Sequence, residues 1–577
     1  MKVRILKDQI HKNIIFSELE AFIFEQSIFN RLHFIIQNSM SFYVYPTNKT
    51  SRFIHSVGVM DVTTSIFINS LKNANVNDVI KFLSFYKDDI ENFVKDFDFS
   101  EFLGKNAYGC RGYVKKFNLR DLFNSIEKIN GVSFINHFSF YNKALNEDLI
   151  VVYYLLLISI RLAALFHDLG HLPFSHLFEN AIGRYFSELD ETDKNYNKLF
   201  KIINSGDDIH EFVGKKLSFL LLKLIVYKHN DCKDILLLLI IKKIVENILT
   251  DEKKYKCLHR IFASDFDADR IDYVIRDSFA SFFIENGCDI DRILKTFILI
   301  KKDDFEFLPS IQALNEIDDF YLQRDKLYSS VINHHKVRKF DTLLERLIVF
   351  ELQKKEKLNE LIDMISELIN LNKNDKQIED IFFRFSKIND DWLLGILRDR
   401  RYHFLKNNEE NIYTFLLDEF FAGKKELKSL WKREYEYYDF LEKLIQKLKS
   451  ENYFSINEND SIEFKALMKK ISDFSDYEKA GALIEFLNKT DWMSKLEKKL
   501  NNDKNFIIIS DAKKQKYPKN LKLVDIANLD VFDYKSVTKR KISRKIMFFI
   551  YSKGIDLATI QKELIILLKE VRDVQSI

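Results

Sequence analysis

The chain has 577 residues, of which 46% are hydrophobic and 14% aromatic, so it carries enough apolar surface for a large folded core and is not globally disordered. Its 53 Phe, against 14 Gly and 4 Pro, exclude collagen-like, linker-like and turn-rich all-β chains, because few residues interrupt helices. The 89 Lys and Arg nearly balance the 86 Asp and Glu, a net charge of +3 that gives no global reason to coat nucleic acid or an anionic membrane. These values predict a mainly helical fold.

The first 150 residues show helical periodicity with one interruption. Apolar residues recur at helical spacing between Phe22 and Ile36, and the chain then turns through SFYVYPTNKT. Residues 61–150 mix helical stretches with a glycine-containing patch at 104–117, GKNAYGCRGYVKKF, which predicts a loop or short hairpin. The N-terminal residues lack the uninterrupted apolar stretch and the small-residue cleavage site that are typical of a signal peptide.

The run Leu149–Phe166 is long and apolar enough to raise the question of a membrane span. Arg161 lies inside it, however, and the run ends directly in His167 and Asp168. We therefore expect a buried core helix that delivers polar residues to a site, and no membrane association. The four cysteines are scattered without a CxxC pair, which fits a reducing compartment and predicts a cytoplasmic protein.

The length corresponds to about three or four domain-sized units, although no repeat or linker marks their boundaries. Apolar residues continue at helical spacing to about residue 350, and the charged, amphipathic stretch after it is typical of helices with solvated Lys and Glu faces. Three short β-type runs and a last helix follow, at 506–510, 521–526, 545–551 and 556–572. We expect a core of 1–350, a helical region of 351–500 and a small α+β appendage of 501–577.

Histidine placement carries the chemical signal. Five of the 13 His lie in or near one polar interruption of the apolar core, and an acidic stretch, SDFDADRIDYVIRDS, follows downstream. These residues are His55, His167, His171, His176 and His210, then Asp265, Asp267, Asp269, Asp272 and Asp277. A single histidine beside an apolar run is more often a packed core residue, and an acidic run is more often a solvated face. Here both kinds of element occur together along one helical chain, which favours a site.

His167 and Asp168 stand where an apolar helix is expected to end, before a glycine and a proline turn the chain. An imidazole beside a carboxylate suits a borderline or hard divalent ion, and the residues leave Mn, Fe, Zn, Ni and Mg undistinguished. Two more ligands must come from elsewhere in the chain, and His55 and Asp269 are the candidates. Four protein ligands leave coordination positions for water and a phosphate oxygen.

Four segments together resemble the HD-domain superfamily: RFIHSVGV (52–59), ALFHDLGHLPFSHLFE (164–179), HE (210–211) and DADRIDYVIRD (267–277). Within it they are similar to the deoxynucleoside triphosphate triphosphohydrolases, which include bacterial dGTPases and the vertebrate antiviral dNTPase. The matched segments fall within about residues 25–350, with fainter similarity in the C-terminal appendage. The resemblance implies a helical HD-domain fold and a metal-dependent enzyme that converts a dNTP and water to a deoxynucleoside and triphosphate.

The resemblance also implies roles for single residues. His55, His167, Asp168 and Asp269 match the family's metal ligands, and a further Mg ion can arrive with the nucleotide. Imidazoles oriented by carboxylates near the scissile bond are matched by His176 with Glu179 and by His210 with Glu211. Arg52 and His171 match residues at the α-phosphate. Sugar contacts are matched by Gln37, Tyr273 and Asp277, and further phosphate contacts by Arg270, Lys336 and Arg338.

Elementary electrostatics agrees with these roles. A triphosphate carries about four negative charges, which Arg52, Arg270, Lys336 and Arg338 can offset through charge-assisted hydrogen bonds. A divalent cation lowers the pKa of a coordinated water, and a protonated histidine on the opposite side can protonate the leaving 5′-oxygen. A carboxylate beside that histidine raises its pKa toward working pH.

The chain departs from the family pattern in two places. His55 and His167 are 112 residues apart, more than in relatives, so residues 70–150 are expected to contain an insertion. It would form a surface helical hairpin, an oligomer contact or a regulatory nucleotide pocket. In the segment 25–33, where the vertebrate relative binds an activating guanine nucleotide, Asn30 and His33 replace the expected glutamine and arginine. Activation by GTP therefore does not carry over, and another effector or none is equally compatible.

Three functional hypotheses follow. The leading one is a dNTP triphosphohydrolase that controls dNTP pools or acts in antiviral defence. The second is another HD phosphohydrolase, acting on nucleoside monophosphates, alarmones or cyclic dinucleotides, and the third is a catalytically silent nucleotide sensor. The resemblance further implies a homo-oligomer (dimer, tetramer or hexamer), whereas nucleic-acid binding has no dedicated motif.

Overall fold

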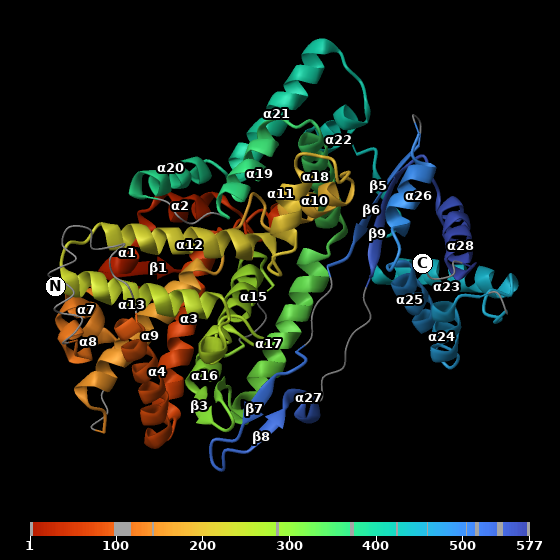
Figure 1. The fold of residues 1–577 in the computed structure, drawn as a ribbon. Coiled ribbons are helices and arrows are strands. Elements are labelled where there is room, and N and C mark those ends of the chain that lie inside the picture. Colours follow the sequence, from red (N-terminus) through yellow and green to blue (C-terminus); the bar gives the residue numbers. More distant parts are fainter. Residues whose placement is uncertain are drawn as a thin grey trace. The chain divides into compact units, whose positions relative to one another are not determined.

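The computed structural model describes residues 4–96, 117–140, 144–283, 288–369, 374–422, 425–457, 460–502, 505–513, 518–538 and 546–573. Within these ranges the chain is mainly helical, as expected (Figure 1). It divides into two compact units. Unit 1 comprises Met1–Leu327, Ile348–Arg398 and Lys516–Arg540, and unit 2 comprises Tyr328–Leu347, Asp399–Gln515 and Lys541–Ile577. The patch expected to be a loop at 104–117 lies, apart from its last residue, outside the described ranges.

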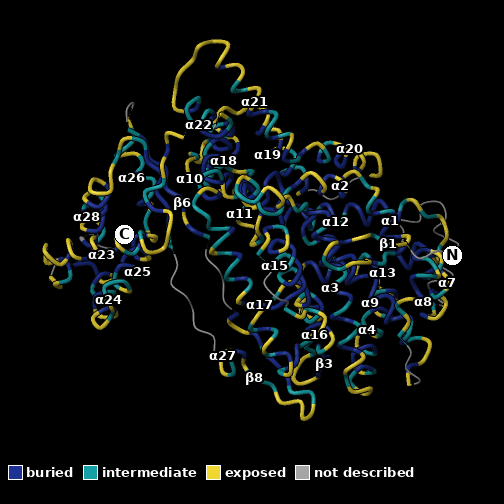
Figure 2. The backbone as a smooth tube through the Cα atoms, turned by 180° about the vertical axis from the view of Figure 1, so that it is seen from behind, coloured by how far each residue is buried: buried dark blue, intermediate teal, exposed yellow. Residues whose placement is uncertain are grey.

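The core of unit 1 is built around α9 (Glu147–Phe166), which packs against α3 (Arg52–Asn73) and α13 (Cys232–Leu249). Every residue of α9 from Val151 onward is buried, and Figure 2 shows this part of the chain in dark blue. Among the described residues, α9 is the one helix long and apolar enough to cross a membrane. Because protein covers it on all sides, the expected core helix is confirmed.

Capping side chains fix where the site-bearing helices begin. Ser51 accepts a hydrogen bond from the Ile54 N–H at the start of α3, and Asp267 accepts one from the Arg270 N–H at the start of α15 (Ala268–Ala280). Each bond satisfies a backbone donor that the first turn of a helix otherwise leaves unpaired. The first turns of α3 and α15 and the C-terminal end of α9 thereby hold the polar segments that the sequence singled out.

An N-terminal hairpin is a feature that the sequence analysis did not anticipate. Strands β1 (Arg4–Asp8) and β2 (Lys12–Phe16) pair antiparallel, with Asp8 opposite Lys12. Two five-residue strands are too short to give a clear period-two pattern. Two further antiparallel pairs belong to unit 1, namely β3 (Ile298–Lys301) with β4 (Phe305–Leu308), and β7 (Lys522–Val524) with β8 (Val531–Asp533).

Further helices complete unit 1. They are α1 (Glu18–Phe24), α2 (Ser27–Asn30), α4 (Val76–Asp96), α7 (Phe123–Asn130), α8 (Val132–His137), α10 (His176–Ser187), α11 (Tyr196–Ile203), α12 (Ile209–Tyr227), α14 (Lys256–His259), α16 (Ile290–Lys295), α17 (Leu314–Lys326), α19 (Lys357–Glu367), α20 (Asp375–Ser386) and α27 (Tyr534–Val537). The described part of the expected insertion is helical: α4 packs on α9, and α7 packs on α13. This arrangement fits the surface-helix alternative, while the oligomer contact stays a prediction.

Unit 2 contains a three-stranded antiparallel sheet in the order β5-β9-β6, formed by β5 (Lys428–Ser429), β9 (Phe548–Lys553) and β6 (Phe506–Asp511). Its helices are α22 (Ile412–Phe421), α23 (Glu434–Ser450), α24 (Ile462–Lys470), α25 (Asp476–Leu487), α26 (Trp492–Leu500) and α28 (Leu557–Asp573), while α18 (His335–Gln353) and α21 (Asp390–Asn407) contribute residues to both units. The buried Trp431 donates from its indole N–H to the carbonyl of Phe548, the first residue of β9, across 3.0 Å.

The division of the chain differs from the one expected at residues 350 and 500. The expected appendage of 501–577 is split, because β7 bonds to unit 1 through the Val524 N–H, which donates to the Pro309 carbonyl across 3.1 Å. Strands β6 and β9 and the last helix, all expected, belong to unit 2. Short β-type runs were thus found correctly, but their partners could not be read from the sequence, because strand pairing joins segments far apart in the chain.

A buried ion pair crosses the core of unit 1. Arg161 of α9 is fully buried and donates to both carboxylate oxygens of Glu20, across 2.6 Å and 2.9 Å. It also donates to the Thr64 hydroxyl across 2.7 Å, and its guanidinium lies 5.0 Å from the centre of the Phe138 ring. The arginine inside the apolar run is therefore fully paired and joins α1, α3 and α9.

Replacing Glu20 with Ala is expected to lower the free energy of unfolding by about 3–5 kcal/mol, because it leaves the Arg161 charge buried without its carboxylate. Urea unfolding followed by circular dichroism measures the change. The matched control is Glu18→Ala, which removes an exposed partner of Arg4 and should leave the midpoint nearly unchanged. Equal midpoints for the two variants would contradict this account of Arg161.

Candidate metal centre and active site

Four side chains from three helices converge in unit 1. His55 extends from the first turn of α3, His167 and Asp168 follow the end of α9, and Asp269 lies in the first turn of α15. His55 Nε2 lies 3.0 Å from Asp269 Oδ1 and 3.4 Å from Asp168 Oδ2. His167 Nε2 lies 3.4 Å from Asp168 Oδ1 and 3.9 Å from Asp269 Oδ1. The structure thus brings together all four ligands expected from the sequence.

The donor set fits a divalent ion. Ligands about 2.1 Å from an ion lie about 3 Å apart around it, close to the separations seen here. His55 Nε2 and His167 Nε2 are both buried, and no described residue forms a hydrogen bond with either atom. Two imidazole nitrogens and two carboxylates turned toward one point are the donors that first-row divalent metals accept. The residues therefore fit the metal that the sequence implied.

Packing explains why the chain turns where it does after α9. A Cβ atom at Gly170 would collide with the His210 carbonyl and with the Gly214 N–H, both on α12, so the turn lies directly on that helix. Later in the same turn, Phe174 and Ser175 have positive φ angles of 56° and 58°. Strain of this kind persists where surrounding contacts hold it.

Those contacts come from residues to which the sequence analysis gave no role. Asp390 accepts from the Phe174 N–H across 2.7 Å and from the Ile36 N–H across 2.9 Å, and burial raises its pKa to about 7. The buried Arg31 donates to the Leu169 carbonyl across 2.6 Å and to the His171 carbonyl across 2.9 Å. No sequence motif marks either residue, since each acts on backbone atoms more than 130 positions away.

Asp168 connects the metal ligands to two basic groups. Its Oδ2 accepts from Arg52 across 2.5 Å, and its Oδ1 lies 3.1 Å from His171 Nε2. Burial raises the pKa of Asp168, but the positive charge of Arg52, together with the neighbouring His167 and His171, outweighs burial and holds this pKa well below its usual value. Burial and the charge of Arg52 lower the pKa of His171 well below its usual value. Asp168 is accordingly ionised and His171 neutral near pH 7.

A proton on His55 competes with a metal ion for this site. Burial lowers the pKa of His55, but the carboxylates of Asp269 and Asp272, which face its two ring nitrogens, and the nearby charges outweigh burial and raise this pKa to about 10. Below that pH the imidazole is protonated in the absence of metal. A cation must compete with this proton, so metal affinity rises with pH over the neutral range.

Three imidazoles and one carboxylate form a second cluster beside the first. His210 Nδ1 lies 2.9 Å from Glu179 Oε1, and His176 Nδ1 lies 3.3 Å from Glu179 Oε2. The His171 and His210 rings stack, with centroids 4.2 Å apart and planes within 5° of parallel. Imidazole lone pairs lie in the ring plane, so two parallel stacked rings cannot both direct one at the same ion. This cluster is therefore better suited to holding a proton than a metal.

Glu179 sets the charge state of this second cluster. Burial lowers the pKa of His210, but the hydrogen bond and charge of Glu179 outweigh burial, so the pKa is raised. Burial raises the pKa of Glu179, but the hydrogen bonds with His176 and His210 outweigh burial and hold this pKa well below its usual value. The sequence paired His210 with Glu211, and the structure corrects this: Glu211 is exposed and lies 3.9 Å from Lys215. One carboxylate serves both His176 and His210.

The expected sugar-reading residues lie in unit 1 with unsatisfied polar atoms. Gln37 Oε1 and both carboxylate oxygens of Asp277 are buried, and no hydrogen bond to them is found among the described residues. Burial raises the pKa of Asp277 to about 7. Tyr273 accepts from Arg324 at its hydroxyl across 2.9 Å. The charge of His55 and the side chain of Asn38 act against burial on the pKa of Asp277. The sugar contacts of these three residues stay a prediction.

The expected phosphate-binding cations have different surroundings. Arg52 is buried beside Asp168 and donates to Ser175 Oγ across 2.9 Å. Arg270 pairs with Asp267 and donates to the Ser264 carbonyl. Lys336 and Arg338 belong to unit 2, where Lys336 is exposed and Arg338 donates to Asp341 across 2.9 Å. Their phosphate role stays a prediction.

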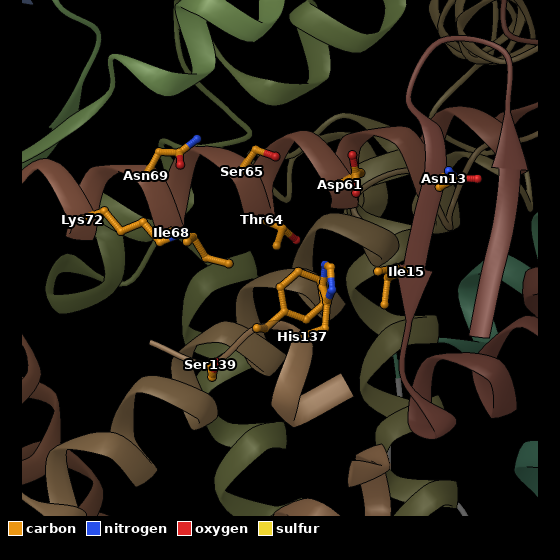
Figure 3. Close-up of a pocket in the computed structure, with 11 residues that line it drawn as sticks. Asn13, Ile15, Asp61, Thr64, Ser65, Ile68, Asn69, Lys72, His137 and Ser139 are labelled. Carbon is orange, nitrogen blue, oxygen red and sulfur yellow. The ribbon is translucent and has the colours of Figure 1, made fainter. Parts of the chain in front are cut away.

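A cavity of about 360 Å³ lies further along α3 (Figure 3). Asp61 to Lys72 of α3 form one side, Asn13 and Ile15 of β2 contribute another, and His137 and Ser139 come from the expected insertion. The insertion therefore does line a polar cavity with α3. Whether it binds a regulatory nucleotide stays a prediction.

Comparisons with known proteins add a distant relationship. No protein-family model matches the chain. An uncharacterized protein of Methanocaldococcus jannaschii is 24% identical over 356 residues, which cover 61% of this chain and 51% of that protein. An uncharacterized protein of Mycoplasma pneumoniae is 25% identical over 323 residues, which cover 53% of this chain and 68% of that protein. The chain thus spans about half the length of the first of these relatives and two thirds of the second.

A protein of Acanthamoeba polyphaga mimivirus, whose name assigns it an HD domain, is 25% identical over 219 residues, covering 37% of this chain and 42% of that protein. The chain is a distant relative of an HD-domain protein. Among solved structures, a hypothetical protein from Aquifex aeolicus and a phosphohydrolase from Bacteroides thetaiotaomicron each share 15% identity at a TM-score of 0.49, covering 98% and 96% of this chain and all of theirs. A likeness this low leaves function to be argued from the site itself.

Replacing Asp168 or His167 with Ala is expected to abolish binding of a divalent metal ion while the chain stays folded, because each change removes a ligand from the convergent set. Isothermal titration of the metal-free protein with Mn²⁺, alongside far-ultraviolet circular dichroism, measures both properties. The control is Glu211→Ala, which removes an exposed carboxylate outside the set. Wild-type affinity in the folded Asp168→Ala protein would contradict the ligand assignment.

Replacing Glu179 with Gln is expected to lower the pKa of His210, because the neutral amide no longer stabilises the imidazolium that the carboxylate favours. At a pH between the two values, the wild-type ring stays protonated and the variant ring loses its proton. NMR titration of histidine labelled with ¹³C at Cε1, assigned with His210→Gln, follows this change. A His210 pKa that is unchanged or higher in the variant would rule out control by Glu179.

Proposed function

We propose that the protein is a metal-dependent dNTP triphosphohydrolase, which converts a dNTP and water to a deoxynucleoside and triphosphate. One observation carries the proposal. The metal-ligand cluster (His55, His167, Asp168 and Asp269) adjoins the proton-holding cluster (His171, His176, Glu179 and His210) through His171. This ring lies 3.1 Å from Asp168 on one side and stacks on His210 on the other. Hydrolysis of a phosphate ester needs an activated water on one side of phosphorus and a proton for the leaving oxygen on the other.

His55, His167, Asp168 and Asp269 would hold the metal ion. When bound, the ion supplies positive charge for a phosphate oxygen and lowers the pKa of a water molecule. Arg52 is buried within the same site, so its guanidinium can stabilise charge that develops on the α-phosphate in a medium of low dielectric constant. Its bond to Asp168 keeps it in place before substrate binds.

Protonation of the leaving 5′-oxygen falls to the second cluster. His210 has a raised pKa and is largely buried, and the more exposed His176 shares its carboxylate partner Glu179. Either ring can carry the proton to the oxygen and take one back from water afterwards. General acid catalysis of this kind typically contributes about 10²–10⁴-fold to the rate.

The choice of a deoxyribose as the sugar comes from the family resemblance at Gln37, Tyr273 and Asp277. Gln37 and Asp277 offer buried, unsatisfied polar atoms, and Tyr273 lies on the same helix as Asp277, one turn before it. Close contact of such groups with the sugar would leave the 2′-hydroxyl of a ribonucleotide without space. The distant relationship to an HD-domain protein supports the broader assignment to metal-dependent phosphohydrolases.

Broader biological roles follow from this activity. A triphosphohydrolase of this kind would lower dNTP pools, with a use in pool control or in antiviral defence. A nucleotide effector and a homo-oligomeric assembly belong to the same proposal and rest on the family resemblance alone.

The test is incubation with each dNTP, singly and in mixtures, under Mn²⁺, Mg²⁺, Fe²⁺, Ni²⁺ and Zn²⁺, with chromatography of the products. We expect a deoxynucleoside and intact triphosphate in equal amounts. In H₂¹⁸O the label should enter triphosphate, because water attacks the α-phosphorus and the P–O5′ bond breaks. Release of phosphate or pyrophosphate, or hydrolysis confined to monophosphates, alarmones or cyclic dinucleotides, would instead support a different HD phosphohydrolase.

A further inference from the structure

A carboxylate behind the metal centre, Asp272 of α15, contacts the side of His55 that faces away from the other ligands. Asp272 Oδ2 lies 2.8 Å from His55 Nδ1, and the Asp272 side chain is fully buried. The sequence analysis noted Asp272 in the acidic stretch but gave it no role. Histidine ligands of metals are commonly held by such a carboxylate, which fixes the tautomer and the ring orientation.

Four donors saturate this carboxylate. Oδ1 lies 2.7 Å from His11 Nε2 and accepts from Arg276 across 2.8 Å, while Oδ2 accepts from Arg276 across 2.9 Å and contacts His55. An ionised carboxylate offers about four acceptor sites and no donor. His55 must therefore present Nδ1–H to Asp272, so that the neutral, metal-binding form of the ring has its lone pair on Nε2, the atom that faces Asp168 and Asp269.

The N-terminal hairpin supplies two of the groups that hold this arrangement. Asp8, the last residue of β1, accepts from Arg276 through both carboxylate oxygens, each across 2.8 Å. His11 lies in the turn between β1 and β2 and reaches Asp272 directly. The hairpin therefore holds both oxygens of Asp272: Oδ1 directly through His11, and Oδ2 through the Arg276 guanidinium that Asp8 binds.

The packing leaves Asp272 no freedom to move. Gly58 lies on α3, one turn after His55, and a Cβ atom there would collide with Asp272 Oδ1 and with the Arg276 guanidinium. The close approach of α3 and α15 thus depends on a glycine at this position. A methyl group would push the carboxylate away from His55 without changing any charge.

We propose that Asp272 is the positioning residue for metal ligand His55, and that His11 of the N-terminal hairpin holds Asp272 in register. The inference rests on the proposed metal centre but not on the identity of the substrate. It assigns the hairpin a role in metal binding, although no hairpin residue is a ligand.

The experiment measures the Kd of Mn²⁺ alone for the metal-free full chain by isothermal titration, with thermal unfolding of each metal-free variant as the check on folding. Asp272→Asn keeps the shape of the side chain but removes its charge, and we expect a loss of metal affinity of about 10–100-fold. His11→Ala should give a smaller loss, and His11→Gln, which retains a donor, should restore part of it. Gly58→Ala should weaken binding through displacement of Asp272.

The control is Lys7→Ala, which removes an exposed hairpin side chain bonded only to Asn13 among the contacts found and should bind Mn²⁺ as the wild type does. The glutamine variant separates a positioning role from a purely structural one. If His11 were only structural, the loss of Mn²⁺ affinity would track the loss in unfolding temperature and would not depend on a hydrogen-bond donor at position 11. Should Asp272→Asn fail to fold, His11→Ala and His11→Gln decide the question.

Wild-type Mn²⁺ affinity in folded Asp272→Asn and His11→Ala proteins would overturn the inference, as would the absence of any metal binding by the wild type. These two outcomes of the Mn²⁺ titration differ from a failure of the proposed function, which is measured by product release. A wild type that binds Mn²⁺ but releases no triphosphate from any dNTP would refute the dNTPase proposal, and a graded loss of affinity across the variants would still support the role of Asp272.

Discussion

The placement of the Asp168 carboxylate is the constraint on which the rest of the site depends. One of its oxygens lies 3.4 Å from His55 and accepts from Arg52, and the other lies near both His167 and His171. The same carboxylate is thus a candidate metal ligand, the partner of the cation Arg52 and the link to the second cluster of His171, His176, Glu179 and His210. Its ionised state depends above all on the charge of Arg52, since burial alone would favour the neutral acid. A site of this kind functions as one unit, and the loss of any member changes the others.

Its position is secured by contacts that lie outside the site. Gly170 lets the turn after α9 lie directly on α12, Arg31 and Asp390 bind backbone groups around that turn, and Gly58 lets α15 approach α3. These are contacts of backbone and small residues, and they place the side chains of three helices within about 4 Å of one another, as catalysis by preorganised groups requires.

The convergence of the four candidate ligands and the principal histidines could be predicted, because three motifs mark them: HD after an apolar run, a histidine in a helix that begins with an arginine, and a repeated aspartate before a tyrosine. The core helix at 147–166 and the last strands were also predictable from apolar periodicity. Three features could not be predicted: the N-terminal hairpin, Glu179 as the partner of His210, and the role of Asp390. Each depends on a contact between segments that are far apart in the sequence, and no sequence pattern in one segment indicates the other. The Glu211 assignment failed for the same reason: adjacency in sequence does not give proximity of side chains at a helix start, where His210 turns inward and Glu211 outward.

The central claim is that one divalent ion binds among His55, His167, Asp168 and Asp269. Anomalous diffraction at the manganese absorption edge, from crystals of the full chain grown with Mn²⁺, tests it most directly. The account predicts one strong peak about 2.1 Å from His55 Nε2, from His167 Nε2 and from one oxygen of each carboxylate. Manganese density elsewhere, with these four side chains bonded only to one another, would contradict it.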